Sequence, residues 1–238
     1  MRAKIVVPLL LLAAAAVPAA AQQQEPTLCP RPDTPGGQQS PIDIVGAVAA
    51  RMDSVSIQYP RVGAVIVNTG NYIRVNVDAT PSNNLRIDGV TLRLEEFHFH
   101  WPGEHKVSGD SFPVEIHMVH KSADGRFAVA LGTWVRVGAY NQAWATLWNH
   151  LPRRGAPSYR TFVEIPRLFA LSSLSKEQVY RYCGSLTTGQ HEEGITWLMR
   201  NHPIEMSATQ LAHLRSVMDR WTRATQPLNN RPIRYWIP

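Results

Sequence analysis

The sequence predicts a single domain of the α+β class that is mainly β and has few helices. From Val55 onward, short runs rich in β-branched and aromatic residues follow one another, and turn residues separate them. The chain has 238 residues, of which 44% are hydrophobic and 18% charged, as is typical of a globular protein. The sequence contains no internal repeat, and no change of composition marks a second domain.

Six segments are expected to form strands, because each is short, largely apolar and bounded by turn residues. In chain order they are residues 54–59, 64–68, 71–77, 90–101, 112–121 and 126–137. The dipeptide Asp124-Gly125 lies between the last two and is typical of a hairpin turn.

Two segments are expected to be helical. Residues 141–150 carry three bulky apolar side chains at helical spacing. Residues 207–223 begin with Ser207 and Gln210, the pair that forms a capping box. An apolar stripe follows, which we interpret as core packing: Leu211, Leu214, Val217, Met218 and Trp221.

Residues 1–21 have the features of a secretory signal peptide. Arg2 and Lys4 precede an apolar run, and three alanines at 19–21 offer a cleavage site. The run is too short to span a bilayer, so we expect an exported protein, periplasmic or secreted, with no membrane contact after cleavage. A retained anchor is the alternative, which the small-residue end disfavours. Residues 22–38, rich in Gln, Pro and Gly, are expected to form an irregular arm.

The charge balance indicates no nucleic-acid partner. The formal net charge is +6, and removal of Arg2 and Lys4 with the signal peptide lowers it to +4. No cluster of Lys and Arg stands out, so a solvated basic surface is the preferred interpretation.

The two cysteines, Cys29 and Cys183, are expected to form a disulfide. An even number of cysteines in an exported protein favours pairing. The alternative is two free thiols, and their spacing does not suggest a metal site built from thiolates.

Three histidines on two of the expected strands form a candidate metal site. In a strand over residues 97–101, His98 and His100 share one face and the aromatic residues share the other. His117 lies in the next long strand and shares a face with Glu115. If the two strands are neighbours, three imidazoles meet, and three neutral histidines with an open fourth position are typical of catalytic zinc. The alternative is that each histidine is a half-buried polar residue of its strand.

Several ordered segments resemble those of the alpha-class carbonic anhydrases. They are residues 39–44 (QSPIDI), 97–101 (FHFHW) leading into Glu104-His105, 115–120 (EIHMVH), 184–188 (GSLTT), 196–197 (TW) and 226–231 (QPLNNR). The resemblance covers about residues 38–236, and the short step from His100 to Glu104 is similar to the bacterial branch. It implies a catalytic domain over residues 39–238, built on a large twisted, mostly antiparallel central sheet with a few peripheral helices. A cone-shaped cleft would lead to the metal.

The resemblance also implies an activity. The family hydrates carbon dioxide reversibly to bicarbonate and a proton with Zn²⁺, and is inhibited by sulfonamides and anions. His98, His100 and His117 would bind the zinc. Thr187 would accept a hydrogen bond from zinc-bound hydroxide and donate its own proton to Glu104.

Other matching residues would complete the site. Thr188 would line it beside Thr187, and Glu115 would accept the free N–H of a ligand imidazole. An apolar wall suits carbon dioxide, which has no charge, and by resemblance it would consist of Val119, Ala130, Leu186 and Trp197.

Three departures from the family pattern stand out. Asn71 replaces the histidine that carries protons in fast members, and its amide does not titrate; His191 is a speculative substitute, or simply a surface histidine. Glu96 replaces a glutamine and would raise the pKa of zinc-bound water. Gly189-Gln190 replaces the two prolines that usually follow the threonine pair, and it would restrict the loop after Thr188 less than prolines would.

Two other functions stay open on the sequence alone. A carbonic-anhydrase-like binding or adhesion domain with little activity is one, although such relatives usually lose a zinc histidine. A zinc esterase is the other. The sequence is also compatible with a homodimer.

Overall fold

The computed structural model describes residues 28–51 and 55–236, and every structural statement below concerns these residues. The expected signal peptide, the first part of the arm and Ser54 lie outside the described residues. Residues 28–38 contain no helix or strand. Within the described part of the chain, no helix has the length and apolar character needed to cross a membrane.

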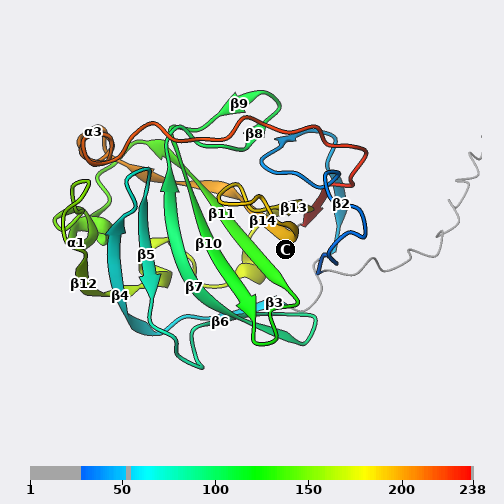
Figure 1. Ribbon diagram of the computed structural model, residues 1–238, viewed down its shortest axis with the longest axis horizontal. Helices are drawn as coiled ribbons and strands as arrows, with labels where there is room; N and C mark the ends of the chain where they lie inside the picture. The colour runs from blue at the N-terminus through cyan, green and yellow to red at the C-terminus, as the bar shows by residue number, and fades with distance from the viewer. Residues whose placement is uncertain (1–27, 52–54, 237–238) are drawn as a thin grey trace, which may run out of the picture.

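A large twisted sheet dominates the fold (Figure 1). The strands are β1 (Asp43–Ile44), β2 (Val48–Ala50), β3 (Val55–Gln58), β4 (Arg61–Asn68), β5 (Ile73–Val77), β6 (Asn84–Ile87), β7 (Val90–His100), β8 (Lys106–Val107), β9 (Asp110–Ser111), β10 (Val114–Ser122), β11 (Ala128–Val137), β12 (Tyr159–Glu164), β13 (Val179–Ser185), β14 (Glu193–Met206) and β15 (Arg234–Trp236).

The main sheet has twelve strands, in the order β12-β4-β5-β7-β10-β11-β14-β13-β15-β2, with β6 paired to β7 and to β3. Adjacent strands within this sheet run antiparallel, except for the parallel pairs β11–β14 and β15–β2. Strands β1, β8 and β9 form a small second sheet. The predicted class, a mainly β domain on a mostly antiparallel sheet, is therefore confirmed.

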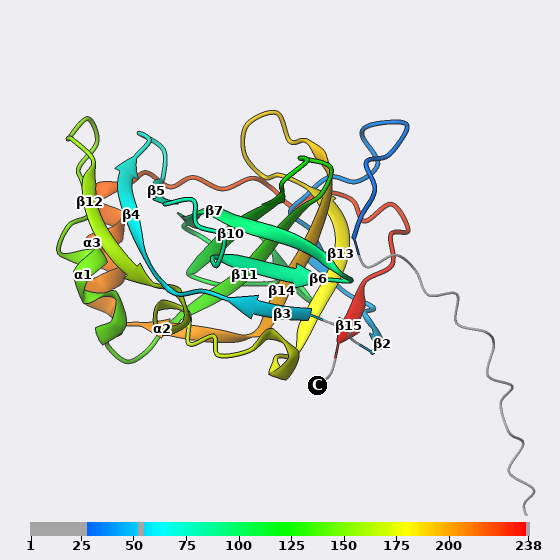
Figure 2. The same cartoon turned by 90° about the horizontal axis from the view of Figure 1, so that it is seen from below.

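The helices are short and peripheral. They are α1 (Ala145–Trp148), α2 (Ile165–Leu168) and α3 (Ala208–Val217), with 3₁₀ turns at Gln142–Trp144 and Leu174–Lys176. Figures 1 and 2 both place α1 and α3 beside β12, at one end of the sheet. The segment expected to be a helix over residues 141–150 is thus a 3₁₀ turn followed by one turn of α-helix.

Helix α3 begins as predicted and ends earlier. The Ser207 hydroxyl accepts from the Gln210 N–H, and the Gln210 side chain accepts from the Ser207 N–H, which completes the capping box. Met218 is extended, and Trp221 pairs with Trp101 as an isolated bridge. The expected helix over residues 207–223 is wrong beyond residue 217, because the chain leaves α3 to pack against the end of β7.

Alternation along β7 separates the core from the site. Phe97 and Phe99 are fully buried on one face, where Phe99 meets Trp148 edge to face at a centroid distance of 5.6 Å. His98 and His100 project from the opposite face. The aromatic core therefore holds rigid the strand that presents the two imidazoles.

The predicted disulfide between Cys29 and Cys183 is confirmed, with the two Cα atoms 5.5 Å apart. It ties the arm to β13, a few residues before Thr187. The Cys29 N–H also donates to Thr196 Oγ1 at 2.8 Å. Closing a loop of 154 residues stabilises the fold by roughly 5 kcal/mol at most in the chain-entropy account.

Candidate metal centre and active site

The strand register brings the three predicted histidines together. β7 and β10 pair antiparallel, with His98 opposite His117 and His100 opposite Glu115. The ring centroids lie 4.9 Å apart for His98–His100, 5.2 Å for His98–His117 and 4.6 Å for His100–His117. One ring nitrogen of each lies within 4.8 Å of those of the other two. All three side chains are buried.

Carboxylates set which imidazole nitrogens are free. His98 Nδ1 lies 3.0 Å from both carboxylate oxygens of Glu96, and His117 Nε2 lies 2.6 Å from Glu115 Oε1. Because each carboxylate accepts an N–H, the opposite nitrogen, His98 Nε2 or His117 Nδ1, carries a lone pair.

These nitrogens fit a metal ion. Among the described residues, His98 Nε2 and both nitrogens of His100 are buried without a hydrogen-bond partner. Unpartnered buried polar atoms are costly, and a bound cation would satisfy His98 Nε2 and one nitrogen of His100. Three neutral imidazoles match the ligand set of catalytic zinc.

Burial favours the neutral form of two of these histidines. It lowers the pKa of His117 to about 4, against the opposing effect of the Glu115 carboxylate. Burial and the neighbouring imidazoles also hold the pKa of His100 well below its ordinary value. His100 and His117 are therefore uncharged at neutral pH, as metal ligation requires.

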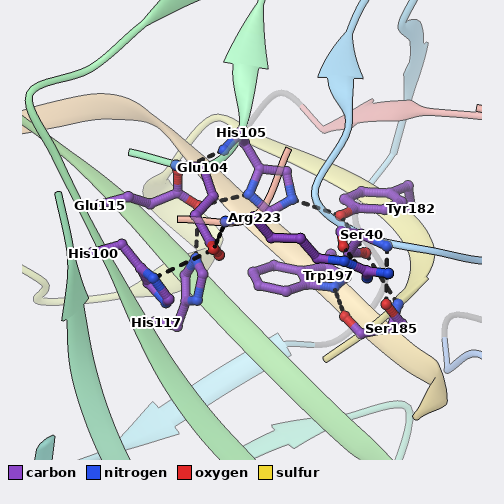
Figure 3. Close-up of polar contacts among 10 residues, drawn as sticks. All are labelled: Ser40, His100, Glu104, His105, Glu115, His117, Tyr182, Ser185, Trp197 and Arg223. Atoms are coloured by element: carbon purple, nitrogen blue, oxygen red, sulfur yellow. Dashed lines mark hydrogen bonds and ion pairs between the residues drawn. The ribbon is translucent and has the colours of Figure 1, made fainter. Parts of the chain in front are cut away.

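Glu115 organises the buried side of the site (Figure 3). Its Oε2 accepts the backbone N–H groups of Glu104 and His105, each at 2.8 Å, and its Oε1 lies 2.6 Å from His105 Nδ1. Burial alone would raise the pKa of Glu115, but His105 and His117 hold it well below its ordinary value. Glu115 is thus a fully buried carboxylate.

The network continues to β13 and to the loop that precedes β1. His105 Nε2 lies 2.6 Å from the Tyr182 hydroxyl, which lies 2.8 Å from Ser40 Oγ. Ser40 in turn accepts the Ser185 N–H at 3.0 Å. The chain of contacts links His117 to the strand that leads to Thr187.

Glu104 lies directly behind the histidines. Its Oε1 is 3.4 Å from His100 Nδ1 and accepts the Arg223 backbone N–H at 2.8 Å (Figure 3). Burial, followed by the charge of Glu115, raises the pKa of Glu104 to about 8. Thr187 Oγ1 is close enough to lower that pKa, although neither Thr187 Oγ1 nor Glu104 Oε2 makes a hydrogen bond of good geometry within the described chain.

A cleft of about 310 Å³ opens over the histidines. One wall is apolar and contains every residue expected to bind carbon dioxide: Val119, Ala130, Leu186 and Trp197. Val119 on β10 lies opposite Ala130 on β11, which in turn lies opposite Trp197 on β14. The other wall is polar, with Tyr72, Arg74, Asn76, Glu95, Glu96 and Lys121.

The structure gathers most of the predicted site residues and leaves one outside. His98, His117, Thr187 and Thr188 also line the cleft, while His100, Glu104 and Glu115 lie buried beneath it. Asn71 is exposed in the turn before β5 and does not line the cleft.

Sequence reasoning missed several residues of the site: Tyr72, Arg74, His105, Tyr182, Trp221 and Arg223. Tyr72 and Arg74 alternate with the buried Ile73 and Val75, which is the strand signal that could have placed them on the cleft face. Trp221 stacks on His100 at 5.1 Å and on Tyr72 at 4.6 Å. Only the extended chain after α3 brings it there, and no local pattern indicates this.

Comparison with known proteins decides the family. Residues 26–237 match the family model for eukaryotic-type carbonic anhydrases. The chain belongs to this family. A carbonic anhydrase from Pectobacterium carotovorum is 40% identical over 201 residues, which cover 83% of this chain and 80% of that protein.

Solved carbonic anhydrases share the fold. The alpha-carbonic anhydrase of Photobacterium profundum is 31% identical with a TM-score of 0.76, covering 84% of this chain and 89% of that one. The alpha-carbonic anhydrase of Thermovibrio ammonificans, solved with the inhibitor sulfanilamide, is 34% identical with a TM-score of 0.76, covering 83% and 87%. The resemblance inferred from sequence motifs is confirmed.

Proposed function

We propose that this carbonic anhydrase hydrates carbon dioxide reversibly to bicarbonate and a proton, with Zn²⁺ held by His98, His100 and His117. The observation that carries the proposal is the convergence of three buried imidazoles beneath an apolar-walled cleft, next to Thr187 and Glu104. Zinc bound there would lower the pKa of a coordinated water to about 7, carbonic anhydrase itself being the standard case of this effect.

The apolar wall binds the substrate. Carbon dioxide carries no charge and no strong hydrogen-bonding group, so contact with Val119, Ala130 and Trp197 favours it over water. These side chains are at least nine-tenths buried, and Leu186 completes the wall.

Thr187 and Glu104 orient the attacking oxygen. In this role the Thr187 hydroxyl would donate a hydrogen bond to Glu104, and it would then have only its lone pairs to offer to the reacting group. Glu104 must be ionised for this role, and both the Arg223 N–H and a nearby dication favour the ionised form. Thr188 lines the cleft beside this pair.

Glu96 and Glu115 fix the ligand rings. Each holds one imidazole N–H at 3.0 Å or less, which sets the tautomer and the ring orientation. Glu96 also places a carboxylate on the cleft wall, in contact with His98, which would hold the metal.

Proton release relies on buffer. Asn71 cannot carry a proton, and it lies outside the cleft lining. His191 is partly exposed, adopts φ +54° and sits in the loop after Thr188; burial and Arg223 lower its pKa. We retain it only as an alternative carrier.

The protein is exported, with residues 1–21 as a cleaved signal peptide and residues 39–238 as the catalytic domain. The disulfide supports this, because such bonds persist in oxidising compartments such as the periplasm or the extracellular space. Arylsulfonamides and small anions are expected to inhibit it, as sulfanilamide is described for the Thermovibrio enzyme.

Zinc content and activity test the proposal together. We expect about one zinc per chain in the wild type and loss of both zinc and carbon dioxide hydration in His117→Ala. His191→Ala is the matched control, since this histidine lies outside the metal cluster, and it should retain its zinc. Full zinc content in His117→Ala would contradict the proposed ligand set.

A further inference from the structure

Arg74 places a guanidinium on the polar wall of the cleft. β5 pairs antiparallel with β7, and the register sets Arg74 directly opposite His98 and Asn76 opposite Glu96. Ile73 and Val75 are buried in the core, so Arg74 points to the side of the sheet that carries the histidines. It lines the cleft together with Tyr72.

No acid neutralises this guanidinium among the described residues. Its Nε is buried without a hydrogen-bond partner, and its charge opposes the rise that burial causes in the pKa of the neighbouring Tyr72 hydroxyl. Both carboxylates of the same wall have other partners: Glu96 holds His98, and Glu95 lies 3.1 Å from Lys121 Nζ. Arg74 therefore presents a positive charge with spare donors to the cleft.

We propose that Arg74 forms a subsite for a planar carboxylate-type anion on the polar wall, facing the apolar wall that takes carbon dioxide. The fork of guanidinium N–H groups matches the two oxygens of such an anion. Two sources share this chemistry, the product bicarbonate and the carboxylate of an organic ligand. The inference rests on the proposed function, because it concerns the same cleft.

Paired arylsulfonamides test the subsite. The probes are 4-sulfamoylbenzoate and its neutral matched analogue 4-sulfamoylbenzamide, titrated into zinc-loaded protein by calorimetry. The wild type should prefer the carboxylate by about tenfold, the range of a partly exposed charge-assisted hydrogen bond. Arg74→Gln should abolish the preference, and Arg74→Lys should keep part of it.

Lys121→Gln is the matched control, since it removes a cation of the same cleft that Glu95 already neutralises. It should keep the wild-type preference. An equal preference in wild type and Arg74→Gln would overturn the subsite, as would no preference in the wild type. If neither sulfonamide binds zinc-loaded wild type, the proposed function itself fails.

Bicarbonate distinguishes the two sources. It is used to displace bound 4-sulfamoylbenzamide from each variant. A severalfold weaker displacement in Arg74→Gln than in wild type would assign the subsite to the product. Equal displacement, beside a lost carboxylate preference, would overturn the assignment to the product and leave organic carboxylates as its ligands.

Discussion

His117 Nε2 lies 2.6 Å from Glu115 Oε1, so the imidazole donates its N–H to a fully buried carboxylate and turns Nδ1 toward the other two histidines. Glu115 also receives two backbone N–H groups and the ring of His105. One carboxylate thus fixes the tautomer and the direction of a proposed zinc ligand, and the strand register alone would fix neither.

Glu115→Gln is predicted to weaken zinc binding about 10- to 100-fold, because the amide has a single acceptor oxygen. Its NH₂ group must then face either the two imidazoles or the two backbone N–H groups that the carboxylate accepts. Competition with a chelator of known affinity measures this. Glu95→Gln, a carboxyl on the cleft wall that contacts no ligand imidazole, is the control. Unchanged affinity in a folded Glu115→Gln protein would show that the carboxylate plays no part in holding the metal.

Glu96→Gln is predicted to shift the pH–rate profile of hydration to lower pH. A carboxylate 3.0 Å from His98 Nδ1 favours the more positive, protonated state of the centre, and the amide removes that preference. Stopped-flow rates between pH 6 and 9 measure the shift. Superimposable profiles for the two proteins would refute this role of Glu96.

Asn71→His is predicted to raise kcat in weak buffer and to leave kcat/KM unchanged. The imidazole can accept a proton near neutral pH, whereas the amide cannot. The comparison uses a buffer-concentration series, and the gap between the variants should close in strong buffer. An equal kcat at every buffer concentration would mean that proton export does not pass through this turn.

His120 is predicted to make the fold sensitive to acid. His120 Nδ1 donates to the Val129 carbonyl at 3.3 Å, and Nε2 accepts from the Tyr59 hydroxyl at 2.8 Å. Burial lowers the pKa of His120 to about 4, below the value of about 6.5 in an unfolded chain. Stability is therefore complete above pH 6.5 and falls as the pH drops toward 4, by about 3 kcal/mol.

Urea unfolding of wild type and His120→Gln between pH 4 and 7 tests this. Glutamine has no group that titrates in this range, so the variant should lose less stability on acidification than the wild type. Stability lost through protonation of the other histidines is common to both proteins and cancels in the comparison. Parallel stability curves would exclude His120 as the titrating group.

The strands that could be predicted from the sequence are those in which apolar and polar residues alternate. β7 and β10 show apolar and polar residues in turn, because one face packs on the core and the other lines the cleft, so His98, His100 and His117 could be assigned to one face. β14 was missed. It lies between β11 and β13, it is buried along most of its length, and its sequence has no period of two.

The residues of the candidate site also fall into a part that local sequence patterns predict and a part that they do not. The histidines lie on local motifs, and their convergence needed only that β7 and β10 be neighbours. Trp221 and Arg223 come from an irregular stretch that follows α3, and they reach the site through tertiary packing alone. No periodicity marks such a segment, so only the structure reveals that it closes the site behind Glu104.

The most direct test of the central claim is carbon dioxide hydration by stopped flow on zinc-quantified wild type beside Thr187→Ala and Thr187→Ser. We predict fast, sulfonamide-sensitive hydration by the wild type, and a loss of about 100-fold in kcat/KM in Thr187→Ala at unchanged zinc content. Thr187→Ser keeps the hydroxyl and should keep most of the rate. One bound zinc per chain with no hydration by the wild type would contradict the account.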